Sequence, residues 1–97
     1  DILFDSRERR CLYNNLSIKP IIILHDEYGF EILKDGKTIY GEKNTPIKNL
    51  NVNGAGDIFA AYFIKNYNSL GLFESSKMAM KETTKLLIKR EKNEQEI

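Results

Sequence analysis

Short apolar runs separated by polar turns make up most of the first half of the chain. Residues 21–24, Ile-Ile-Ile-Leu, form a continuous and largely β-branched run, which is typical of a strand buried on both faces of a sheet. Two further strand-like runs, residues 28–33 and 37–40, lie on either side of Asp35-Gly36. An Asp-Gly pair between such runs is a strong β-hairpin signal. The pattern therefore predicts a buried strand followed by a hairpin.

Three other segments have the features of helices. After an apolar start at residues 2–4, Ser6 can act as the N-cap of a helix that continues to about residue 16. Residues 58–64 are apolar on nearly every face, which predicts a buried helix. A second C-terminal helix is expected from about residue 73 to residue 89. Its core-facing stripe would contain Phe73, Ala79, Met80, Leu86, Leu87 and Ile88.

Composition limits the classes of protein to which the chain can belong. Its 97 residues are 41% apolar and 30% charged, enough for one modest core in a soluble globular unit, so we expect a single partial domain over residues 1–97. No apolar run approaches the roughly 20 residues that span a bilayer, and no signal peptide is recognisable. We therefore expect a cytoplasmic protein with no membrane partner.

Charge and cysteine content exclude further classes. The net charge of +1 provides no basis for a nucleic-acid footprint, so no nucleic-acid partner is expected. Cys11 is the only cysteine, which rules out an internal disulfide and a cysteine-rich metal cluster. Candidate chemistry must therefore come from other side chains and from the backbone.

The most informative segment is residues 51–57, Asn-Val-Asn-Gly-Ala-Gly-Asp, which directly precedes the predicted buried helix. The first amides of a helix lack intrahelical partners, and the helix dipole adds positive charge, so anions bind there. Gly54 and Gly56 let the backbone approach a phosphate, and Ala55 adds little bulk. Asp57 would repel a phosphate as a simple ligand, but it suits a general base that deprotonates a hydroxyl as the oxygen attacks phosphorus. Ordinary helix capping is the alternative explanation.

These residues resemble the C-terminal signature of the PfkB, or ribokinase-like, carbohydrate kinases, which is close to Asp-Thr-x-Gly-Ala-Gly-Asp-x-Phe. The residues that match it are Gly54, Ala55, Gly56, Asp57 and Phe59. The preceding strand and hairpin follow the family's order, so the resemblance covers roughly residues 17–90. It implies an α/β fold, namely the C-terminal portion of a ribokinase-like three-layer sandwich with a β-hairpin and two C-terminal helices.

The resemblance also implies roles for individual residues. Asp57 would be the catalytic base, and the amides of Gly54, Ala55 and Gly56 would form the anion hole for the transferred phosphoryl group. The nucleotide would be bound by residues spread along the chain, namely Asp26, Gly29, Gly56 and Lys81. ATP and Mg²⁺ are the implied cofactors.

Several positions depart from the family pattern. Asn51-Val52 stands where the signature has Asp-Thr, on a strand that helps to hold a monovalent cation in some members, so Asn51 and Asn53 are the candidate cation ligands. Residues 90–93, Arg-Glu-Lys-Asn, replace a glycine-containing loop near the adenine. These departures leave open whether nucleotide binding is retained.

The expected function is that of the C-terminal catalytic segment of an ATP-dependent kinase that phosphorylates a sugar, a nucleoside or a related small alcohol. Family members are longer and carry their sugar-binding residues in the N-terminal part, so we expect this segment to be inactive by itself. Its exposed apolar surface would favour homo-oligomers or association with the missing part. Two alternatives stay open, a non-catalytic nucleotide- or anion-binding module and a purely structural α/β interaction domain.

Overall fold

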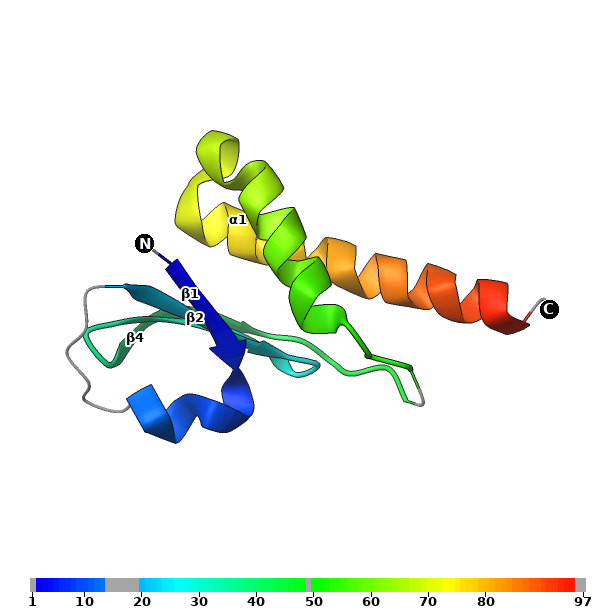
Figure 1. The fold of residues 1–97 in the computed structure, drawn as a ribbon, viewed down its shortest axis with the longest axis horizontal. Helices are drawn as coiled ribbons and strands as arrows, with labels where there is room; N and C mark the ends of the chain where they lie inside the picture. The colour runs from blue at the N-terminus through cyan, green and yellow to red at the C-terminus, as the bar shows by residue number, and fades with distance from the viewer. Residues whose placement is uncertain (1, 14–19, 49, 96–97) are drawn as a thin grey trace. The chain divides into compact units, whose positions relative to one another are not determined.

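The computed structural model describes residues 2–13, 20–48 and 50–95. The chain forms two compact units, Asp1–Pro46 and Ile47–Ile97. A four-stranded sheet belongs to the first unit and a C-terminal helix to the second (Figure 1). The mixed α/β composition expected from the sequence is therefore confirmed.

The sheet of the first unit has the strand order β1-β2-β3-β4. Strand β1 pairs parallel to β2, whereas β2–β3 and β3–β4 are antiparallel. The strands are β1 (Ile2–Ser6), β2 (Ile21–Asp26), β3 (Gly29–Lys34) and β4 (Lys37–Lys43). In β2, the consecutive residues Ile22, Ile23 and Leu24 are all buried. Since neighbouring side chains of a strand point to opposite faces, the prediction of a strand covered on both sides is confirmed.

The β3–β4 hairpin has the predicted Asp-Gly turn. Asp35 and Gly36 both have positive φ angles, 53° and 76°. A two-residue loop with both central residues at positive φ is a type I′ turn, whose twist matches that of the flanking strands. The short polar side chain of Asp35 tolerates this conformation, and the adjacent glycine adopts it without steric cost.

The β2–β3 hairpin depends on a different glycine. The backbone amide of Tyr28 donates to Asp26 Oδ1 over 2.8 Å, which closes the turn. Gly29 follows with φ of 139°, and a Cβ atom built there would lie 2.1 Å from the carbonyl oxygen of Glu42 in β4. Only glycine lets the two backbones approach this closely, so the fold itself requires Gly29.

The helix predicted from Ser6 is present as a 3₁₀ helix, η1 (Arg7–Tyr13). Ser6 acts as the predicted cap, since its Oγ accepts the amide of Glu8 over 3.3 Å. Residues 14–16, the end of the predicted helix, lie outside the described residues. A 3₁₀ helix has three residues per turn, so Arg7, Arg10 and Tyr13 share one face. This repeat brings the three side chains to the same side of the segment.

The shared face of η1 bonds to carboxylates of the sheet. Arg7 pairs with Asp26 and with Glu31, each over 3.2 Å, and Arg10 pairs with Glu31 over 3.0 Å. These groups are half-buried, so solvent screens them less than it screens fully exposed ion pairs. Three links from two arginines thus fix η1 over β2 and β3.

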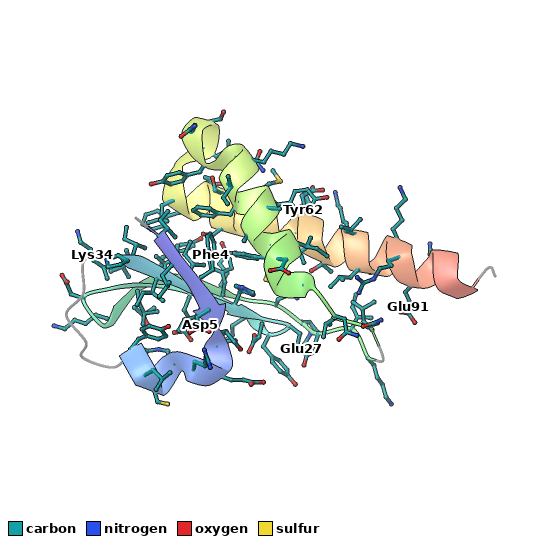
Figure 2. The ribbon with its side chains drawn as sticks, in the orientation of Figure 1. Phe4, Asp5, Glu27, Lys34, Tyr62 and Glu91 are labelled. Atoms are coloured by element: carbon teal, nitrogen blue, oxygen red, sulfur yellow. The ribbon has the colours of Figure 1, made fainter. Side chains whose placement is uncertain are left out.

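The third η1 residue of this face makes both a polar and an apolar contact. The Tyr13 hydroxyl donates to Asp5, which is labelled on β1 in Figure 2. This hydrogen bond holds the pKa of Asp5 below its usual value and raises the pKa of Tyr13. The Tyr13 ring also packs against the buried cluster of Ile22, Leu24 and Leu33. Tyr13 therefore joins η1 to the hydrophobic core of the first unit.

The second unit contains α1 (Ala55–Gln95), which is interrupted at Gly71. Gly71 has φ of 77° and ψ of −175°, far from helical values, and the chain turns back there (Figure 1). The two expected C-terminal helices are thus confirmed as the halves of α1 before and after Gly71. In the described residues, no helix has the length and apolar character required to cross a membrane.

The buried face of the second half of α1 differs from the predicted stripe. Ala79 and Leu87 are buried as expected, but Phe73 and Leu86 are 44% and 38% exposed. The other buried positions of this half are polar residues, Ser75, Ser76 and Thr83. The predicted stripe was therefore wrong in part, because the buried positions follow spacings of three and four residues and include polar side chains.

Candidate functional site

The glycine segment forms a tight turn that leads directly into α1. The Ala55 amide donates to the carbonyl of Val52 over 3.0 Å, and Gly54 has φ of 78°. This is the geometry of a type II β-turn, whose third residue needs a positive φ and is therefore usually glycine. The carbonyl of Gly54 accepts the first helical hydrogen bond, from Ile58 over 3.1 Å, so Gly54 is the N-cap of α1.

The backbone amides of the turn are used unequally. The Ala55 amide, predicted to line the anion hole, is engaged inside the turn and is not available in this conformation. The amides of Gly56 and Asp57 have no hydrogen-bond acceptor among the described residues. They are the first-turn donors that a helix leaves unsatisfied, and the helix dipole makes them attractive to anions. A candidate anion hole therefore consists of Gly56 and Asp57.

The turn offers open space beside an exposed carboxylate. A Cβ atom built on Gly54 would meet nothing within 4 Å, so the backbone there is open to a ligand. Asp57 is exposed, three residues after the N-cap. A carboxylate at this position can bond back to the N-cap amide in a capping box, but Asp57 accepts no such bond within the part of the chain that is described. The capping explanation thus lacks its expected contact.

A distant arginine holds the same turn. Arg90, near the end of α1, donates from Nη2 to the carbonyl of Asn51 over 2.9 Å and from Nη1 to the carbonyl of Asn53 over 3.1 Å. Figure 2 labels its neighbour Glu91 on this part of the helix. The partners are 39 and 37 residues apart in the sequence, so no local pattern indicated the contact. From the sequence, Arg90 was expected only to be part of the segment that replaces a glycine-containing loop.

This contact argues against the predicted monovalent-cation site. The Asn51 and Asn53 carbonyls both accept from the guanidinium, and Asn51 Oδ1 accepts the Asn53 amide over 3.0 Å. A metal ion at these oxygens would lie beside a permanent positive charge, which would repel it. In the described residues, no group of three histidine, cysteine, aspartate or glutamate side chains could hold a metal either. Asn51 and Asn53 therefore do not fit a bound metal ion.

The residues expected to flank the nucleotide lie in both units. In the first unit, Asp26 accepts from Arg7 and from the Tyr28 amide, and Gly29 is required for strand contact. Each thus has a structural role that explains its residue type. In the second unit, Lys81 is exposed on α1, about 14 Å along the helix axis from Arg90 at 1.5 Å per residue. Lys81 consequently lies well away from the helix turn that carries Arg90.

Comparison with known proteins yields no assignment. No protein-family model, curated protein or solved structure matches the chain. Evidence about function therefore comes from the geometry of the glycine turn and from the resemblance of its residues to a known signature.

Proposed function

We propose that this chain is the C-terminal catalytic segment of a ribokinase-like, ATP-dependent kinase that phosphorylates a hydroxyl of a sugar, a nucleoside or a related small alcohol. One observation carries the proposal. Asp57 is an exposed carboxylate that makes no hydrogen bond within the described residues. It lies directly after a glycine turn, in the first turn of a helix whose Gly56 and Asp57 amides have no acceptor there. A base adjacent to an anion hole is the arrangement that phosphoryl transfer to an alcohol requires.

Each of these groups has a role in the proposed phosphoryl transfer. Asp57 accepts the proton of the alcohol, and the alcohol oxygen forms a bond to the γ-phosphorus of ATP. The bond from this phosphorus to the bridging oxygen breaks, and ADP leaves with the electron pair. The amides of Gly56 and Asp57 stabilise the negative charge on the transferred phosphoryl group. A Mg²⁺ ion bound with the nucleotide would supply screening of the phosphate charge.

Replacement of the proposed base tests the function. Asp57→Asn keeps the shape of the side chain but removes its basicity, so kcat in the complete kinase should fall by about 10²-fold or more. Asp35→Asn is a matched control, because Asp35 is an exposed aspartate in the β3–β4 turn and asparagine tolerates its positive φ. Release of ADP, measured with a panel of sugars and nucleosides, provides the rates. Equal rates for Asp57→Asn and the control would refute the assignment.

A nucleotide- or anion-binding module without catalysis is the second candidate. Asn51-Val52 in place of Asp-Thr supports it, since the change removes a carboxylate and a hydroxyl from the signature. Calorimetric titration with ATP, ADP and inorganic phosphate separates the two functions. Nucleotide binding without turnover of any alcohol would favour the module, and absence of binding would favour a structural domain.

Self-association and location belong to the same proposal. Apolar side chains around the bend of α1 are exposed, namely Ile64 (67%), Leu70 (41%) and Phe73 (44%). Exposed groups of this kind favour contact with a second copy or with another part of the kinase. A cytoplasmic location is proposed because the proposed kinase needs ATP, which is available there.

A further inference from the structure

We infer that the Arg90 guanidinium is a built-in cation of the glycine turn and takes the place of the monovalent metal ion implied by the family resemblance. The evidence is the pair of hydrogen bonds from Arg90 to the Asn51 and Asn53 carbonyls, at 2.9 and 3.1 Å. Carbonyl oxygens are the backbone groups that bind alkali-metal ions in proteins. Here the same kind of group binds a side-chain cation.

The geometry suits a guanidinium better than a metal ion. Its planar fork presents several donors in fixed directions, so one side chain can bond to two carbonyls at once. A second cation at the same two oxygens would be repelled. The chain thus carries its own positive charge at these two carbonyls, where a solvent ion would bind and dissociate.

The two anchored residues lie on either side of Val52, whose own carbonyl accepts the Ala55 amide. Arg90 therefore fixes the first part of the turn from which the Gly56 and Asp57 amides follow. Its positive charge also favours a phosphate near this turn. Arg90 acts through the backbone and is a positioning residue. Its effect on catalysis rests on the proposed kinase function, whereas its hold on the turn does not.

The experiment compares Arg90→Ala with Lys89→Ala, which removes an exposed neighbouring charge from the same helix turn. Amide resonances of Gly54 and Gly56 are recorded in KCl and in choline chloride at equal ionic strength. For the native sequence we expect identical spectra in both salts, and identical kcat of the complete kinase in both salts. Arg90→Ala should shift both glycine resonances and lower kcat about tenfold or more, as expected for loss of hydrogen bonds from a charged group. Lys89→Ala should change neither.

Chemical rescue separates positioning from a loss of folding. Added guanidinium chloride, at concentrations well below those that unfold proteins, should restore the glycine resonances and kcat of Arg90→Ala but leave Lys89→Ala unchanged. Arg90→Lys keeps the positive charge but lacks the planar fork of donors. Its kcat and its glycine resonances should therefore lie between those of the native protein and those of Arg90→Ala. If Arg90→Ala does not fold, the resonances and salt response of Arg90→Lys provide the same comparison.

Two results would overturn the inference. One is a requirement of the native protein for K⁺, seen in kcat or in the Gly54 and Gly56 resonances. The other is an Arg90→Ala spectrum that matches the native one. Absence of kinase activity from the complete kinase would refute the proposed function alone, because the resonances report on the turn without any substrate.

Discussion

Two glycines of this protein lie where a turn leads into a regular element, yet their surroundings differ. Gly29 begins β3, and a Cβ atom there would collide with the Glu42 carbonyl oxygen at 2.1 Å. Gly54 precedes α1, and a Cβ atom there would meet nothing within 4 Å. Both residues have positive φ angles, 139° and 78°. Packing against β4 explains why residue 29 is a glycine. At Gly54 no neighbouring atom would hinder a side chain, so packing does not explain the open space there.

The same contrast separates the polar groups of the two units. In the first unit, the carboxylates of Asp5, Asp26 and Glu31 all bond to side chains of η1. In the second unit, the described atoms provide no acceptor for the Gly56 and Asp57 amides. Unsatisfied donors are costly when they are buried, but at an exposed helix start they are available to a ligand. A glycine motif therefore indicates function only where its space and its amides are left open.

Replacement of Gly29 should have the largest effect on stability. Gly29→Ala adds a Cβ atom against the backbone of β4 and forces an alanine into a conformation that favours glycine. Overpacking and backbone strain together should lower the free energy of unfolding by about 3 kcal/mol or more. Urea denaturation followed by circular dichroism measures the loss. A loss below that of Gly54→Ala would contradict the contrast between the two glycines.

Gly71 provides an intermediate case. Its φ of 77° and ψ of −175° lie in a region that is essentially restricted to glycine, but a Cβ atom there would meet nothing within 4 Å. Gly71→Ala should therefore cost roughly 2 kcal/mol from backbone strain alone. Gly71→Asn should cost about as much, because asparagine tolerates the left-handed helical region but not this one. An asparagine variant as stable as the native protein, in the same denaturation experiment, would contradict this explanation.

The sequence predicted those elements whose signals are local. The β-branched run of β2, the Asp35-Gly36 turn and the glycine turn before α1 each depend on neighbouring residues, and each was placed correctly. The 3₁₀ form of η1 was not predicted, because the partners that bind its arginines lie on β2 and β3. The exposure of Phe73 was missed because hydrophobic spacing alone does not show which face a helix buries.

The candidate site could likewise be predicted only in part. Its local half, Gly54 to Asp57, was identified from residue types that suit an anion at a helix start. Its distant half, Arg90, was not identified, because the contact joins residues 37 and 39 positions apart. An arginine near a helix end is common and carries no local sign of its partner. The same contact was missing from the expectation of a cation at Asn51 and Asn53, whose carbonyls accept hydrogen bonds from Arg90.

Replacement of Gly54 should have the smallest effect on stability and sharpens the contrast most. Gly54→Ala places a side chain at φ of 78° but meets no neighbour, so unfolding should become easier by only about 1 kcal/mol. Gly54→Asn should cost less than Gly54→Ala, since asparagine is tolerated at the third position of a type II turn. This order differs from the one expected at Gly71, where alanine and asparagine should be equally costly.

The functional effect of the same variants should be larger than their effect on folding. Any side chain at Gly54 occupies the open space where the proposed phosphate would approach, so kcat/KM for ATP should fall about tenfold or more in both variants, as when a transition-state contact is lost. Parallel measurement of urea midpoints and ADP release separates the two effects. If kcat/KM falls only as far as the urea midpoint of each variant falls, the space at Gly54 is not used by a ligand. Loss of activity in the stable asparagine variant would mean that this glycine is kept for its open space.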